Sequence, residues 1–274
     1  SDADPNWRLT NFSTDTGIVA NTVQTIGDSV YLDDRGITRL SRVQQFGNFD
    51  MTSFSQLIDP LLGKYRRRIV ASTVIREKNQ YRIFFNDGSG VIACFAGAEL
   101  LGFSQFAFNK NVTCTCNAED TTGAEQVFFG DDLGYVYHME RGTSLDGDNI
   151  VTVMRPAFTP CGRNAVRKKF FSMEVEAKAL SKTYLNVIPD FDHSNPNIAS
   201  HETLNVHAIG GGGYWDQAIF NEVYWSASSL FNARLSLNGR GTEISTFIST
   251  DSNIANPHII SALIYHHAPL GWRK

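Results

Sequence analysis

The chain has 274 residues and a formal net charge of −4, and it contains 22 glycines but only 8 prolines. This slightly acidic balance excludes a strongly basic nucleic-acid-binding domain, which carries an excess of lysine and arginine. No apolar run approaches 18 residues, so we expect no membrane span. The length and the 42% hydrophobic content suffice for one large or two ordinary domains, and frequent glycine is typical of short strands joined by turns.

The first 165 residues repeat one pattern, in which an apolar strand is followed by a tight turn and a return strand. The turns are marked by Gly36, Gly90 and Gly134, because a tight reversal needs a positive φ that glycine adopts freely. These glycines are separated by 54 and 44 residues, which is compatible with the four-stranded blades of a β-propeller. We therefore predict that residues 1–165 form propeller-like blades, as a complete or a partial propeller.

One segment departs from the strand pattern between residues 46 and 62. Its apolar side chains have helical spacing, and Thr52 or Ser53 is placed to cap the first turn. Pro60 limits the helix to a short one or breaks it. We expect one amphipathic helix packed on the edge of a blade, with these residues on its apolar side: Phe54, Leu57, Ile58, Leu61 and Leu62.

The character of the chain changes between residues 141 and 170, where turn residues accumulate. A new alternating strand begins at Val166 and runs to Ala177, and the segment from His258 to His267 alternates in the same way. We therefore predict a second domain over residues 166–274, with the fold of a β-sandwich. The expected fold class is all-β: propeller-like blades, one short helix and a sandwich domain.

Three runs, in this order, resemble a family of tail proteins from short-tailed bacteriophages, the propeller-plus-sandwich proteins of the tail hub and nozzle. The first run covers residues 27–36, followed by Phe46-Gly47 and the Ile58-Asp59-Pro60 segment. The second covers residues 135–147 and continues at residues 167–170. The third covers residues 237–244, the strand from Ile259 to Tyr265 and the basic end Arg273-Lys274.

The resemblance spans nearly the whole chain and implies a non-enzymatic structural protein of the virion tail. It implies that copies of the chain assemble into a ring, expected to be a hexamer, around the channel through which viral DNA leaves the capsid. The implied partners are other copies, other tail or adaptor proteins, and DNA in transient, non-specific passage. Assembly would take place in the bacterial host cytoplasm. The chain looks like the C-terminal portion of such a protein.

Two basic runs are candidates for contact with DNA phosphates or with a neighbouring subunit. The denser one is expected on a strand, where alternation would send Arg66 and Arg68 to one face and Arg67 to the other. A solvated or interface strand is the plainer interpretation of both runs. The candidate contact residues are Lys64, Arg66, Arg67, Arg68, Arg167, Lys168 and Lys169.

Metal and cofactor sites are not predicted. The segments Asp146–Asn149 and Asp190–His193 bring oxygen donors close together, but neither has the full ligand set of a calcium loop. The four cysteines, Cys94, Cys114, Cys116 and Cys161, do not follow zinc-ligand spacing and are expected as free thiols.

Two alternatives remain: a propeller glycosidase, and a β module that binds carbohydrate or a receptor. The segment Ser13–Gly17 matches the core of an Asp-box turn, but Ala20 stands where that motif has an aromatic residue. An exposed aromatic platform on the second domain would favour a binding module. In the tail-protein interpretation, the aromatic residues expected to dock neighbouring copies are Tyr214, Trp215, Tyr224 and Trp225. Burial in the core of the second domain is the other interpretation of these four.

Overall fold

Within its described ranges the computed structural model is mostly β, with one short α-helix and several small antiparallel sheets, none of them closed. The all-β expectation is therefore confirmed. The chain divides into two compact units, residues 1–141 and residues 142–274. The structure describes residues 17–41, 53–97, 99–179, 182–192, 203–209, 230–253 and 258–272.

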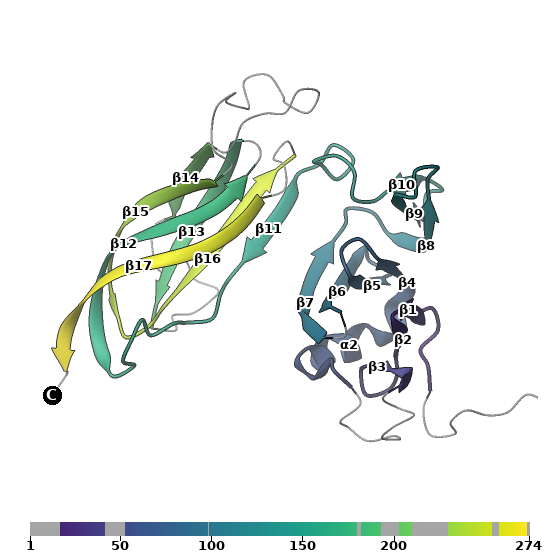
Figure 1. The fold of residues 1–274 in the computed structure, drawn as a ribbon, viewed down its shortest axis with the longest axis horizontal. Coiled ribbons are helices and arrows are strands. Elements are labelled where there is room, and N and C mark those ends of the chain that lie inside the picture. Colours follow the sequence, from purple (N-terminus) through teal and green to yellow (C-terminus); the bar gives the residue numbers. More distant parts are fainter. Residues whose placement is uncertain are drawn as a thin grey trace, which may run out of the picture. The chain divides into compact units, whose positions relative to one another are not determined.

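The first unit contains three sheets, and in each of them consecutive strands pair antiparallel in chain order (Figure 1). The first sheet is β1-β2-β3, the second is β4-β5-β6-β7, and the third joins β8, β9 and β10. The strands are β1 Gln24–Ile26, β2 Asp28–Leu32, β3 Ile37–Arg39, β4 Ile69–Ile75, β5 Gln80–Phe85, β6 Ser89–Ala96, β7 Glu99–Ala107, β8 Val112–Glu119, β9 Glu125–Asp131 and β10 Val136–His138.

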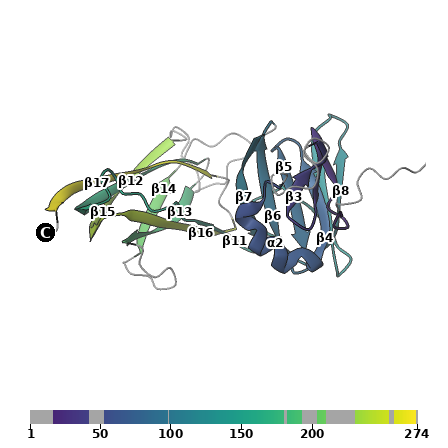
Figure 2. The same ribbon diagram turned by 90° about the horizontal axis from the view of Figure 1, so that it is seen from below.

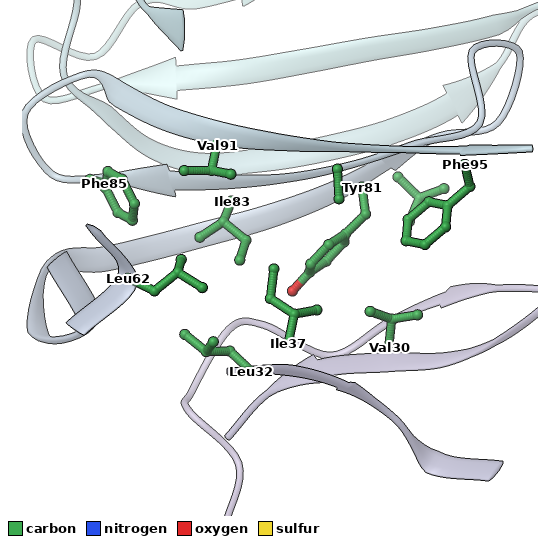
Figure 3. Close-up of a cluster of buried hydrophobic side chains, with 11 residues drawn as sticks. Val30, Leu32, Ile37, Leu62, Tyr81, Ile83, Phe85, Val91 and Phe95 are labelled. Atoms are coloured by element: carbon green, nitrogen blue, oxygen red, sulfur yellow. The ribbon is translucent and has the colours of Figure 1, made fainter. Parts of the chain in front are cut away.

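Strand β5 is buried on both faces, which explains its almost continuous apolar sequence. Tyr81 and Ile83 point toward Val30 and Ile37 of the first sheet, in a cluster that Figure 3 shows. Phe84 points the other way, into a second cluster shared with the third sheet. Full burial of each of these large side chains contributes about 2 kcal/mol. The middle sheet is thus packed between the other two.

The helix α2 spans Asp59–Tyr65 and is seven residues long. Pro60, which was expected to keep the helix short or to break it, lies in its first turn. Proline is tolerated in the first turn because its missing N–H has no intrahelical acceptor there. The 3₁₀ turn η2, Gln56–Ile58, leads into it, and α2 lies beside β6 in both views (Figures 1 and 2).

Two details of the predicted helix are wrong. No side chain caps α2, because Ile58 occupies the N-cap position; Thr52 lies outside the described residues. Leu57 is 92% exposed rather than packed, whereas Leu62 is 3% exposed and reaches the cluster between the first two sheets.

The expected turn at Gly90 is also corrected. Gly88, with φ +78°, makes the reversal, while Gly90 lies inside β6. A Cβ atom at Gly90 would collide with the Ile83 carbonyl oxygen and the Phe106 ring. Gly90 is therefore required by a close approach of neighbouring strands, not by a turn.

The second unit contains a four-stranded sheet, β11-β16-β13-β14, and a three-stranded sheet, β15-β12-β17. One hydrophobic cluster takes residues from both sheets, among them Phe170 and Met173 of β12 and Leu185 and Val187 of β13. The strands are β11 Ile150–Met154, β12 Val166–Ala179, β13 Lys182–Phe191, β14 Leu204–Ile209, β15 Leu230–Gly241, β16 Ile244–Ser252 and β17 His258–Trp272.

The boundary between the units differs from the expected one at residue 165. The chain divides after Arg141, because β11 pairs with β16 from Ile150↔Ser252 to Met154↔Ile248. Residues 142–165 therefore belong to the second unit. The strands expected from Val166 and from His258 are both present, as β12 and β17.

Candidate functional site

The denser basic run lies on α2 and on the 3₁₀ turn that follows it, η3, Arg66–Arg68. The expected strand alternation is wrong, because the chain at these residues is helical and enters β4 only at Ile69. Lys64, Arg67 and Arg68 are exposed, and Arg66 is partly exposed. We call Lys64, Arg66, Arg67 and Arg68 the basic cluster.

Tyr65 organises the basic cluster. Its ring stacks on the buried Phe85 ring with 4.6 Å between centroids. The Lys64 Nζ lies 5.2 Å from the Tyr65 centroid and the Arg68 Cζ lies 5.7 Å from it. Cations at these distances are attracted to the ring face, so the aromatic pair holds two positive charges next to the core.

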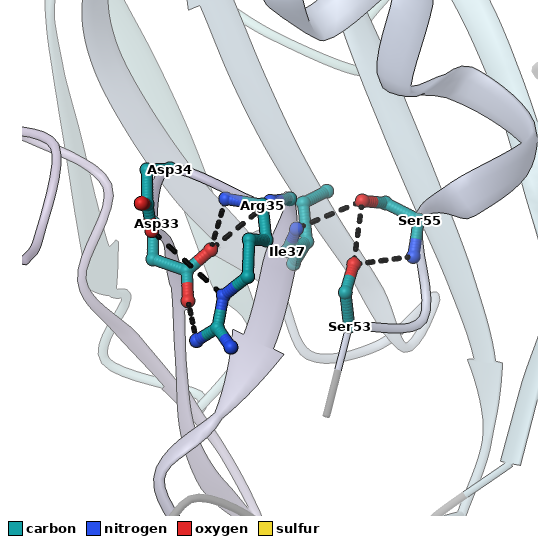
Figure 4. A network of polar contacts seen from close by, with 7 residues as sticks. Asp33, Asp34, Arg35, Ile37, Ser53 and Ser55 are labelled. Atoms are coloured by element: carbon teal, nitrogen blue, oxygen red, sulfur yellow. Dashed lines mark hydrogen bonds and ion pairs between the residues drawn. The ribbon is translucent and has the colours of Figure 1, made fainter. Parts of the chain in front are cut away.

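The turn between β2 and β3 anchors the segment that leads to α2 (Figure 4). Asp33 is 1% exposed, and its Oδ1 accepts hydrogen bonds from the backbone N–H groups of Arg35, at 2.8 Å, and Gly36, at 3.0 Å. Ser55, just before η2, accepts a 2.8 Å hydrogen bond from the Ile37 N–H and donates one to Asp59. The start of α2 is therefore fixed to the first sheet.

Gly36 makes this anchor possible. Its φ is +137°, and a Cβ atom there would lie 2.5 Å from the Ser53 Oγ and closer still to the Ser55 Oγ. Only glycine combines that φ with so close an approach of two hydroxyl groups. The glycine predicted from the sequence as a turn residue thus also positions the basic cluster.

The second basic run divides into buried and exposed residues. Lys168 is 2% exposed, and its Nζ donates hydrogen bonds to the carbonyl oxygens of Arg163, Val166 and Thr242 at 2.8, 3.0 and 2.9 Å. This removes Lys168 from the candidate contact surface, because all three ammonium protons bind backbone. Arg167 and Lys169 are exposed, as a contact would require.

The two oxygen-rich segments differ. At Asp146–Asn149 the chain makes a turn, in which Leu145 and Asp148 exchange backbone hydrogen bonds of 2.9 and 3.1 Å. In the second segment the aspartates make structural contacts, and His193 lies outside the described residues. Asp190 pairs with Arg155, and the Asp192 Oδ1 accepts hydrogen bonds from the N–H and the hydroxyl of Thr242. Asp192 is partly buried, which raises its pKa, but the hydrogen bonds from Thr242 outweigh burial and lower it overall. Among the described residues, no three His, Cys, Asp or Glu side chains lie close enough together to hold a metal ion.

Several candidates from the sequence lie outside the described residues: Ser13, Tyr214, Trp215, Tyr224 and Trp225. The cysteines are free thiols where the structure places them, with Cys114 and Cys116 exposed on β8. Sequence reasoning missed that these two share one outward face of the third sheet. Their spacing of two residues on a strand was the signal for it.

No protein-family model matches the chain, and no curated protein matches it at a significant level. Across the described ranges, no helix has the length and apolar character needed to cross a bilayer.

Proposed function

We propose that the chain is a structural protein of a short-tailed phage virion, part of the hub or nozzle ring around the DNA exit channel of the tail. In this proposal the first unit is a partial β-propeller and the second a β-sandwich. The observation that carries the proposal is the threefold repetition of one sheet design within the first unit.

The repetition extends to the chemistry of the turns. In all three sheets the second and third strands are joined by a turn in which an aspartate Oδ1 accepts backbone N–H groups. Asp33 binds Arg35 and Gly36, Asp87 binds Ser89 at 3.1 Å, and Asp131 binds Leu133 and Tyr135 at 3.0 and 2.8 Å. A carboxylate in this position replaces the hydrogen bonds that a tight turn leaves unmade. Equivalent turns at equivalent places favour blades of one kind.

The first strands of the three sheets are also linked to one another by polar side chains. Gln24 of β1 donates to the Ser72 carbonyl oxygen of β4 at 2.9 Å, and Thr115 of β8 donates to the same oxygen at 3.0 Å. Asn117 of β8 hydrogen-bonds both Thr73 and the Val74 carbonyl oxygen. Radial repetition in a propeller places the first strands of successive blades side by side, which is the arrangement these contacts support.

The second unit supports the sandwich part of the proposal. Its two antiparallel sheets contribute alternate residues to one cluster, in which Phe170, Val175, Val187 and Ile244 are all at most 1% exposed. Face-to-face packing of two such sheets is the arrangement of a β-sandwich. Rigid units of this kind suit a ring that closes by repeating one interface.

The basic cluster would serve in this ring as a contact for DNA phosphates or for an acidic neighbouring subunit. Because the chain as a whole has a net charge of −4, an exposed group of cations confines the attraction for phosphates or acidic side chains to one place on its surface. Non-specific phosphate contact is weak and salt-dependent, and such contact lets DNA slide.

Light scattering on the purified chain, alone and mixed with the other tail proteins, tests the proposal. The expected result is a discrete ring, near six copies, that forms alone or on addition of those proteins. Electron microscopy of the same fractions checks that the particle is a closed ring with a central channel. If the chain stays monomeric at all concentrations and binds none of the other tail proteins, the proposal is overturned.

A further inference from the structure

The middle strand of the three-stranded sheet in the second unit contains a β-bulge that exposes an aromatic side chain. Strand β12 runs between β15 and β17 (Figure 1), and its register with both neighbours shifts between Phe170 and Ser172. Opposite β17, Phe171 is an extra residue without a partner. Phe170 is fully buried in the core, whereas Phe171 is 45% exposed. A bulge re-aims a side chain, and this one turns a ring out of the sheet.

The Phe171 ring lies beside a histidine ring on the same outer face. The centroids of Phe171 and His266 are 6.4 Å apart, with 26° between the ring planes. A 3.0 Å hydrogen bond joins His266 Nε2 to Glu174 Oε1 and fixes the histidine in turn. An exposed ring that is already held by its neighbours loses little freedom when a flat ligand stacks on it.

Two cations lie directly across from each other on this face. Lys169 of β12 pairs with Arg240 of β15, and both side chains are exposed. The neighbouring residue on each strand, Phe170 or Gly239, faces the core, so both cations point away from it. Across the described part of the chain, neither cation forms an ion pair. Like charges that face each other on neighbouring strands destabilise a sheet.

Elsewhere on the same face, charged residues have suitable partners. Glu174 of β12 lies across from Arg234 of β15, with 3.8 Å between the carboxylate and Nε. Asn232 donates a 3.0 Å hydrogen bond to the same carboxylate. The repulsion between Lys169 and Arg240 is therefore local to one end of the sheet. An anion bound between the two cations would remove it.

We propose that this end of the face binds single-stranded nucleic acid. An unpaired base stacks on the Phe171 ring, and the phosphates on either side of it contact Lys169 and Arg240. We call Lys169, Phe171, Arg240 and His266 the stacking patch. This inference goes beyond the proposed function, because it concerns the second unit alone and does not require a ring.

The combination of one exposed ring with two cations favours this class of ligand over others. In a duplex the bases stack on one another and hide their faces, whereas an unpaired base offers a free face to an aromatic side chain. A neutral sugar could cover the ring but would leave the two cations facing each other. An acidic peptide would neutralise the cations but would leave the ring in water.

Fluorescence anisotropy with three labelled DNA probes tests the proposal on the full chain. The probes are a single strand of thymidines, an abasic strand of the same length, and a duplex. The abasic strand keeps the phosphates and lacks the bases, so it measures the charge contribution alone. We expect the chain to bind the thymidine strand about tenfold more tightly than the abasic strand, which is the range of one stacked base.

The variant Phe171→Ala tests the ring. It should remove the preference for the thymidine strand and leave the affinity for the abasic strand and for the duplex unchanged. The matched control is Tyr184→Ala, because Tyr184 of β13 is 43% exposed but belongs to the other sheet of this unit. That variant should keep the preference.

The variant Arg240→Glu separates binding from stability. It places a negative charge across from Lys169, so the Tm should stay the same or rise. The affinity for the thymidine strand should nevertheless fall by about tenfold, because one cation is lost and a repelling carboxylate takes its place. A purely structural role of Arg240 predicts the reverse, a lower Tm with unchanged binding.

The outcomes separate this inference from the proposed function. Equal affinities for the thymidine and abasic strands, or equal effects of Phe171→Ala and Tyr184→Ala, overturn the stacking patch. Arg240→Glu with full affinity for the thymidine strand overturns it as well. Light scattering reports on the ring separately: a monomer that prefers the thymidine strand keeps this inference and overturns the ring, and a ring without that preference does the opposite.

Discussion

Arg82 of β5 and Glu140, which follows β10, form an ion pair with 2.7 Å between Nη2 and Oε1. The Arg82 side chain is 7% exposed and the Glu140 side chain 33%. Lys78 also pairs with Glu140. Burial raises the pKa of Glu140, but the hydrogen bond from Lys78 and the charge of Arg82 outweigh burial and lower it overall. Glu140 thus neutralises a buried cation and joins the second sheet to the third.

Replacement of Glu140 by glutamine should destabilise the first unit by about 2 kcal/mol, because it leaves the buried Arg82 charge without a counter-ion. The matched control is Glu119→Gln, since Glu119 pairs with Arg76 where both side chains are more than 60% exposed. That change should cost less than about 0.5 kcal/mol. Urea unfolding followed by circular dichroism measures both. Equal losses for the two variants would contradict a special role for the buried pair.

The same pair predicts a dependence of stability on pH. Because the pKa of Glu140 is lower in the folded chain than in the unfolded chain, the unfolded state binds the proton first as the solution is acidified. The stabilisation is therefore complete above the unfolded pKa and is lost as the pH falls through the folded pKa. Unfolding free energy measured from neutral pH to below the ordinary glutamate range should fall less steeply in Glu140→Gln than in the wild type. Parallel curves would refute the linkage.

The glycines of the first unit allow backbone strain to be separated from steric collision. Gly36→Ala would cause both, because the φ of residue 36 is +137° and the new Cβ would collide with Ser53 and Ser55. We expect the free energy of unfolding to fall by about 3 kcal/mol. Gly97→Ala would cause backbone strain alone, because its φ is +57° but no atom lies within 4 Å of the new Cβ. This change should lower the free energy of unfolding by about 1 kcal/mol. Gly17→Ala meets neither and should be nearly neutral. A different order of the three Tm values would contradict this account.

Alternation and turn chemistry made much of the fold predictable. Apolar residues alternate with polar ones along β12 and β17 because every second side chain faces the core, so both strands could be predicted. The turn glycines Gly36 and Gly134 adopt positive φ, as predicted. The turn at Gly88 was misplaced to Gly90 because both residues are glycine, and only the packing of Phe106 shows which one is needed for close approach. The unit boundary was missed because the partner of β11, strand β16, lies about a hundred residues further along the chain.

The candidate site was less predictable, because exposure is a tertiary property. The sequence Arg66-Arg67-Arg68 does not distinguish a strand from a 3₁₀ turn. Pro60 indicates only that a helix begins nearby. The three residues Arg167, Lys168 and Lys169 look equivalent in sequence. Only the carbonyl oxygens gathered around the Lys168 Nζ, one of them from Thr242, distinguish the buried lysine from its neighbours.

Lys168 should therefore act on stability and not on binding. Lys168→Met leaves the carbonyl oxygens of Arg163, Val166 and Thr242 without their donor, and we expect a loss of about 3 kcal/mol. Lys169→Met removes an exposed ammonium group and should change the free energy of unfolding by less than about 0.5 kcal/mol. Thermal unfolding of the two variants measures both changes in stability. A stable Lys168→Met chain would show that the three hydrogen bonds contribute little.

The basic cluster should give the chain a weak, sequence-independent affinity for duplex DNA that depends steeply on salt. Each phosphate contact contributes about 0.9 to the slope of log affinity against log salt concentration. Replacing Arg66, Arg67 and Arg68 together by glutamine should thus lower the magnitude of that slope by up to about 2.7. The control is Arg76→Gln, because Arg76 is already paired with Glu119. Fluorescence anisotropy with labelled DNA at several salt concentrations measures the slope. If the triple variant keeps the wild-type slope, the cluster does not contact DNA and an acidic neighbouring subunit becomes its expected partner.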